Sequence, residues 1–126
     1  MLEIQTSKFD PADLPHPTGY RLIIEPIQIE AKTESGFILP DAAVKAKEAL
    51  RNIGRVVAMG SEAYQHSKFE GGRWCEVGDW VAYAQYAGQE MAIKNANGTG
   101  CSVFRIVNDD EILARIPDPK AVLIYV

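Results

Sequence analysis

Short hydrophobic runs, rich in β-branched and aromatic residues and separated by corners containing glycine or proline, dominate this chain of 126 residues. Such runs are typical of β-strands. Asn95–Gly100 predicts a hairpin turn, because Asn and Gly adopt positive φ angles at little cost. There is no pattern of a long helix, so we expect an all-β domain, a small antiparallel β-barrel. The expected strands lie at Leu2–Gln5, Tyr20–Ile29, Asn52–Gly60, within Cys75–Tyr83, and at Met91–Ile93, Ser102–Val107 and Ile112–Ile116.

The polar segment 30–51 departs from this pattern and carries three large apolar residues in succession, Phe37–Leu39. Gly36 weakens a helix there, and Pro40 biases the residue before it away from the helical region. The tripeptide is therefore either a short buried strand or an exposed hook for a partner, and its polar flanks favour the hook. Ala42–Leu50 is expected to be a marginal helix or a disordered return limb. Long loops in compact domains are usually functional or disordered.

The two ends of the chain differ from its centre. Residues 1–16 are expected to form an arm, which Pro15–Gly19 separates from the first long strand. Pro26 marks either an edge or a bulge of that strand, because proline cannot donate to a sheet ladder. Ser61–Cys75 has no regular pattern, and residues 117–126 form an extension with a markedly apolar end.

Composition and charge exclude several classes of protein. The chain is 47% hydrophobic and 24% charged, as in an ordinary globular domain, and is long enough to bury a core. Its net charge is −4 with scattered basic residues, so no nucleic-acid surface is indicated. No signal peptide is apparent, and no apolar run approaches the ~18 residues of a membrane span. We expect a soluble, cytoplasmic protein.

Candidate catalytic or metal-binding residues are sparse. Cys75 and Cys101 lie far apart without ligand spacing and are expected to be ordinary reduced thiols. His16 is expected in a turn and His66 in a solvated loop. Asp109–Glu111 is expected to be a solvated turn rather than a metal cluster, because consecutive acids point in different directions. We expect no enzymatic activity, metal or cofactor, and the tryptophans Trp74 and Trp80 are expected in the core or wall.

Five segments, in order, resemble the co-chaperonin family, the GroES-type lids of chaperonins. They span about four fifths of the chain, and the second is similar to the family's mobile-loop sequence KTxGGIxLP. Five matching segments in the family's order are not expected by chance. The five are Pro17–Pro26 (PTGYRLIIEP), Lys32–Pro40 (KTESGFILP), Gly54–Gly60 (GRVVAMG), Val77–Val81 (VGDWV) with Tyr86–Gly88 (YAG), and Asp110–Ala114 (DEILA).

The resemblance implies a heptameric ring that caps a GroEL-type chaperonin and encloses a folding chamber for a substrate protein. The partner, not this chain, would bind ATP. The tip of the mobile loop would dock on the partner, and the strands Tyr20–Ile24 and Ile112–Ile116 would pair across neighbouring subunits. The implied chaperonin-binding residues are Gly36, Phe37, Ile38, Leu39 and Pro40, and the implied interface residues are Tyr20, Leu22, Ile24, Ile112, Leu113 and Ile116.

The chain also departs from the family pattern. Tyr20 replaces the usual Asp, and Phe37 replaces the usual Ile or Val. Ser61–Cys75 does not resemble the roof hairpin of the bacterial lid, so a different roof or a wider opening is expected. The implied domains are an arm at 1–16, a barrel at 17–116 with a loop at about 30–51 and a roof-region insertion at about 61–75, and an extension at 117–126. These departures resemble lids encoded by tailed bacteriophages, which would act in the host bacterial cytoplasm.

Two readings of other classes remain. Val77–Val81 also fits zinc-dependent alcohol dehydrogenases, although the chain ends before any nucleotide-binding fold and its Cys and His residues lack zinc spacing. A viral structural or assembly protein with a swapped arm fits the two terminal extensions. It leaves the loop motif unexplained.

Overall fold

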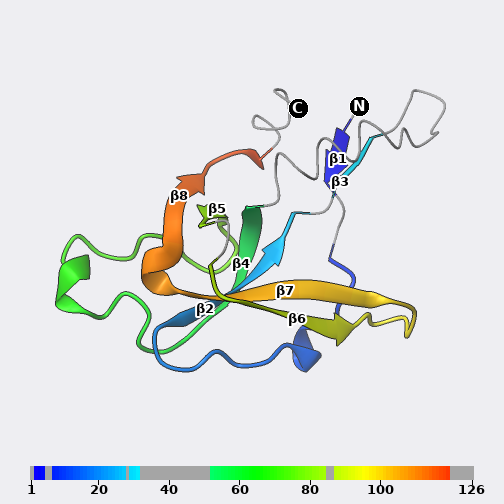
Figure 1. Ribbon diagram of the computed structural model, residues 1–126, viewed down its shortest axis with the longest axis horizontal. Helices are drawn as coiled ribbons and strands as arrows, with labels where there is room; N and C mark the ends of the chain where they lie inside the picture. Colours follow the sequence, from blue (N-terminus) through cyan, green and yellow to red (C-terminus); the bar gives the residue numbers. More distant parts are fainter. Residues whose placement is uncertain (1, 5–6, 28, 32–51, 85–86, 120–126) are drawn as a thin grey trace.

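The structure is a computed structural model that describes residues 2–4, 7–27, 29–31, 52–84 and 87–119. Its main element is a six-stranded antiparallel sheet in the order β6-β7-β2-β4-β5-β8 (Figure 1). The described residues contain three short 3-10 helices, η1 (Pro11–Asp13), η2 (Ser67–Phe69) and η3 (Asp109–Glu111). The all-β prediction is confirmed, and the sheet is consistent with a GroES-like β-barrel. Its strands are β2 (Arg21–Pro26), β4 (Ile53–Met59), β5 (Trp80–Tyr83), β6 (Gln89–Lys94), β7 (Cys101–Asn108) and β8 (Ile112–Ile116).

A second, two-stranded sheet lies apart from the main one. β1 (Leu2–Ile4) pairs antiparallel with β3 (Ile29–Ala31) (Figure 1). The sequence pattern predicts one strand over Tyr20–Ile29, but the structure divides this stretch between β2 and β3. The irregularity of β2 also lies earlier than Pro26, since its register with β4 shifts between Ile23 and Ile24.

β2 runs through the middle of the sheet and is buried on both faces. It pairs with β7 on one edge and with β4 on the other. Side chains alternate along a strand, so Leu22 and Ile24 enter one hydrophobic cluster while Ile23 enters another. All three are fully buried. The continuous apolar run in the sequence reflects this double burial.

The larger cluster lies inside the curled sheet and is closed by the segment 61–75. Tyr64, Phe69 and Cys75 from this segment pack with Val81 and Tyr83 of β5. The described part of the segment contains η2 and turns but no strand, and it loops outward to the left in Figure 1. No roof-like hairpin is therefore present among these residues.

The smaller cluster lies on the other face of the sheet and is completed by the N-terminal arm. Phe9 packs edge-on against Phe104 of β7, with ring centroids 4.9 Å apart, and both contact the cluster of Ile23. The β6–β7 hairpin extends away from the sheet centre, and its turn follows the predicted Asn95–Gly100 (Figure 1). The N-terminal arm is thus part of the fold, because Phe9 packs into the smaller cluster.

Candidate functional site

The expected chaperonin-binding residues lie outside the described residues, which stop at Ala31 and resume at Asn52. The structure does show what flanks them. The chain enters the segment from β3 and leaves it into β4, which lies between β2 and β5. The expected binding residues that fall outside the described ranges are Gly36, Phe37, Ile38, Leu39 and Pro40, and the expected marginal helix at Ala42–Leu50 also falls outside them.

The expected subunit interface is only partly available at the surface. Leu113 on β8 is 65% exposed, and the edge of β8 away from β5 has no partner strand among the described residues. Ile116, at the end of β8, is partly exposed. A free edge next to an exposed leucine is a surface on which another strand could add.

Three of the other expected interface residues are buried inside the subunit. Leu22 and Ile24 are fully buried inside one subunit, and both edges of β2 are already paired within the chain. Ile112 is also buried in the main cluster. These three side chains fill the core, so β2 has no free backbone edge at Leu22–Ile24 to offer to a neighbour.

Tyr20 is 48% exposed and lines a surface pocket of about 550 Å³. The pocket lies between the segment 61–75 and the turn that carries η3. Its floor includes the buried Phe69, and its rim includes His66 and the ion pair of Lys68 Nζ with Asp110 Oδ2 at 2.8 Å. Tyr20 therefore contributes to this pocket, and its expected place at the subunit interface stays a prediction.

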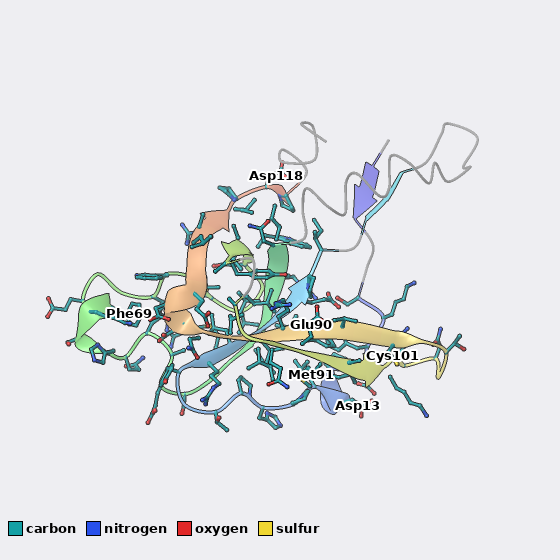
Figure 2. All side chains as sticks on the ribbon, in the orientation of Figure 1. Asp13, Phe69, Glu90, Met91, Cys101 and Asp118 are labelled. Atoms are coloured by element: carbon teal, nitrogen blue, oxygen red, sulfur yellow. The ribbon has the colours of Figure 1, made fainter. Side chains whose placement is uncertain are left out.

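Three aromatic rings stabilise the segment 61–75. The rings of Tyr64 and Phe69 meet edge to face at 4.8 Å, and Trp74 meets Phe69 at the same distance. Trp74 keeps 44% of its surface exposed. Phe69 is the last residue of η2, and its side chain points from the outward loop toward the barrel (Figure 2). The aromatic residues give this irregular segment a small core of its own.

Asp109 corrects the expectation of a solvated acidic turn. It is only 4% exposed, and its Oδ2 accepts the backbone N–H of Tyr64 at 3.0 Å. η3 starts with a capping box, in which the Glu111 carboxylate accepts the N–H of Asn108 at 2.8 Å. The spacing Asn-x-x-Glu is the one sequence signal that could have indicated an ordered turn here.

Burial also changes the ionisation of nearby groups. Tyr64 Oη lies 3.4 Å from Cys75 Sγ. Burial, reinforced by this contact, raises the pKa of the Tyr64 phenol well above its usual range. Burial likewise raises the pKa of the Cys75 thiol. A thiol held in its neutral form is a weak nucleophile, so the environment of Cys75 is that of a structural residue.

The remaining candidates do not come together. Both cysteines are free; Cys101 is exposed near the far end of the β6–β7 hairpin (Figure 2). His16 and His66 are exposed, and His66 Nδ1 caps η2 by accepting the N–H of Lys68. Within the described ranges, no group of three or more His, Cys, Asp or Glu residues could hold a metal. No helix in the described part of the chain is long and apolar enough to cross a membrane.

Comparison with known proteins identifies the family. Residues 15–116 match the family described as "Chaperonin 10 Kd subunit". The chain is 35% identical over 100 residues to the protein named "Co-chaperonin GroES" from Bacillus sp. (strain PS3), covering 79% of this chain and 96% of that protein. It is 38% identical over 102 residues to the protein of the same name from Thermotoga petrophila, covering 81% and 95%.

A third relative, the "Co-chaperonin GroES" of Petrotoga mobilis, is 32% identical over 104 residues, covering 81% of this chain and 96% of that protein. These matches support neither a zinc enzyme nor a viral structural protein. The bacteriophage origin stays a prediction, as the relatives named here are bacterial. The chain belongs to the chaperonin 10 kDa subunit family and is a co-chaperonin, not an enzyme.

Proposed function

We propose that this protein is a ring-shaped lid, a heptamer, that caps a GroEL-type chaperonin in the cytoplasm and encloses a folding chamber for a substrate protein. The partner binds the ATP, and this chain needs no cofactor. The observation that carries the proposal is the family match over residues 15–116, within which the loop sequence Lys32–Pro40 falls between β3 and β4.

The contact with the partner is assigned to the apolar tip of the binding loop, defined as residues 32–51, with Gly36 and Pro40 on either side of Phe37–Leu39. Burial of one such side chain stabilises the complex by roughly 1.5–3 kcal/mol. Fixing the backbone of the loop on binding costs conformational entropy that offsets much of this gain. A single loop therefore binds weakly.

Several loops on one ring convert weak contacts into a usable affinity. Once one loop has bound, the others bind at a high effective concentration. Weak individual contacts also allow release when the partner changes conformation. Phe37, larger than the family's usual aliphatic residue, requires a wider groove on the partner or gives a larger contact area.

The seam between subunits is assigned to the free edge of β8, with Leu113 as its main apolar contact and Ile116 beside it. Pairing of this edge within a ring removes an open edge that would otherwise invite aggregation. The neighbour's contribution comes from a segment other than β2, since β2 is saturated by β4 and β7.

The variant Ile38→Asp tests the proposed function. A charge within the apolar tip should abolish nucleotide-dependent co-sedimentation with a GroEL-type chaperonin while native mass spectrometry still shows the intact ring. Ala43→Asp adds the same charge to the polar limb and should bind nearly normally. Undiminished co-sedimentation of Ile38→Asp, with the ring intact, would rule out this loop as the contact.

A further inference from the structure

The N-terminal strap, defined as residues 2–4 and 7–14, precedes the region that matches the family, which begins at residue 15. We propose that this strap positions the binding loop: Ser7 and Phe9 fasten it to the barrel, and β1 holds the chain where it enters the loop. The role of the loop rests on the proposed function above, whereas the attachment of the strap to the barrel is independent of that function.

The first anchor is hydrophobic. Phe9 is 9% exposed and meets Phe104 edge to face, with the two ring centroids 4.9 Å apart. Leu14, at the other end of the strap, packs against the same cluster. An edge-to-face aromatic pair adds to the stabilisation from burial alone. The strap therefore has a fixed attachment on the face of the sheet that β2 and β7 share.

The second anchor is made by the backbone of the β6–β7 turn. The N–H of Ala96 donates to the carbonyl oxygen of Lys8 at 2.9 Å, and Phe9 forms an isolated antiparallel bridge with Asn95. These contacts do not depend on the side chain of Lys8, which is exposed. The strap thus runs beside the hairpin in a defined register.

The third anchor joins the strap to β2, which leads through β3 into the loop, and to β4, which follows the loop. Ser7 Oγ donates to Glu25 Oε1 of β2 at 2.6 Å and accepts from Arg55 Nη2 of β4 at 2.9 Å. Glu25 and Arg55 are register partners and form an ion pair at 3.9 Å. β2 leads through β3 into the loop and β4 follows the loop, so Ser7 lies at the base from which the loop departs and returns.

β1 is attached only a few residues beyond this anchor. Its register places Leu2 opposite Ala31 and Ile4 opposite Ile29. Ala31 is the last residue of β3 and directly precedes the loop. A two-stranded ribbon is marginally stable by itself in water. The nearby anchors keep β1 at a high effective concentration beside β3, which makes this pairing possible.

Pairing of β3 with β1 has two consequences for the loop. It sets the point and direction at which the chain leaves the barrel, and it holds three residues that would otherwise have to be ordered when the partner binds. Both effects favour association. Because every subunit of a ring carries a strap, a small effect on one loop is multiplied over the assembly.

The test compares the intact protein with a deletion of residues 2–6, which removes β1 but keeps Ser7 and Phe9. Hydrogen exchange of the assembled protein should show amides of residues 29–31 exchanging at least about tenfold faster in the deletion variant, because their partner strand is gone. Association with a GroEL-type chaperonin should weaken by about tenfold or more. Native mass spectrometry checks that assembly is unchanged.

Two single substitutions complete the test. Phe9→Ala keeps β1 but releases its hydrophobic anchor, so it should also speed exchange at residues 29–31 and weaken association. Lys8→Ala is the matched control within the strap and should behave like the intact protein. If hydrogen exchange at residues 29–31 is unchanged in both the deletion variant and Phe9→Ala, the strap does not fasten β3. If exchange is faster but association with the chaperonin is unchanged, the strap does not position the loop. If the intact protein itself fails to bind, the proposed function falls, while exchange still decides whether the strap holds β3.

Discussion

The carboxylate of Asp109 accepts the backbone N–H of Tyr64 at 3.0 Å, although 45 residues separate the two in the chain. Tyr64 has a φ angle of +59°, the one positive value among the described non-glycine residues. A tyrosine in this conformation is strained. The buried carboxylate thus helps to hold the segment 61–75 against the barrel in a conformation that the segment would not adopt alone.

Asp109→Ala should destabilise the protein by about 1–3 kcal/mol, because it leaves the buried N–H of Tyr64 without its acceptor. Asp109→Asn keeps an acceptor oxygen and should cost less. Chemical unfolding followed by tryptophan fluorescence measures both, and Trp74 reports on this segment directly. Asp110→Ala is the control: its ion pair with Lys68 is exposed and screened by solvent, so its loss should have little effect on stability. Equal effects of the Asp109 and Asp110 changes to alanine would contradict this assignment.

Stability should decrease in alkaline solution. Burial raises the pKa of the Cys75 thiol and of the Tyr64 phenol, and it raises the pKa of Tyr83 to about 12. The unfolded chain therefore loses these protons at lower pH than the folded protein. The stabilisation is complete below about pH 8.5, where an unperturbed thiol titrates, and declines progressively above it.

Unfolding midpoints measured from neutral pH to about pH 11 test this decline. Tyr64→Phe removes one buried phenol, so the unfolding midpoint should fall less steeply with pH at the upper end of this range. Cys75→Ala removes the buried thiol and should reduce the fall at the lower end. A midpoint that stays constant across this range in the unmodified protein would show that burial does not hold these groups neutral.

Leu113→Asp should prevent assembly, because it introduces a charge beside the free edge of β8 where the neighbour is proposed to pair. Native mass spectrometry should show single subunits with an intact fold by circular dichroism. Val77→Asp is the control, since Val77 is similarly exposed at 59% but lies in the turn before β5. An intact oligomer with Leu113→Asp would refute the proposed seam.

Gly60→Ala should destabilise the fold by about 1–3 kcal/mol, as expected for an overpacked site. A methyl group on Gly60 would collide with the backbone carbonyl of Gly19, and the N–H of Gly60 already donates to Arg21 O at 2.8 Å. Gly71→Ala is the matched control, because its methyl group would meet nothing within 4 Å. Thermal unfolding distinguishes them; similar midpoints would contradict the close approach seen at Gly60.

The strands of the main sheet were predictable because each carries its own signal, whereas β3 was not set apart from the strand expected at Tyr20–Ile29. Alternation or continuous apolar runs mark them, and Asn95–Gly100 joins β6 to β7 as its Asn and Gly content predicts. The position of a strand within the sheet is a different matter. Leu22–Ile24 has the continuous apolar pattern of a strand covered on both faces, but the second cover includes Phe9 from the arm, and no local pattern connects these two segments.

The proposed contact at the loop tip stays a prediction, because the residues that would make it lie outside the described ranges. The loop motif could be recognised from consecutive residues, whereas the interface depended on which strand edges are free. Asp109 was missed because three consecutive acids usually indicate a solvated turn, and its partner Tyr64 belongs to a distant segment. Long-range pairs of this kind depend on the three-dimensional path of the chain.

The antiparallel pairing of β1 with β3 has a practical consequence for handling the protein. An affinity tag or fluorescent fusion placed before Leu2 would emerge beside Ala31, the register partner of Leu2. Such a label would crowd the departure of the loop on every subunit at once. Labels are better attached through the exposed thiol of Cys101, which lies near the far end of the β6–β7 hairpin.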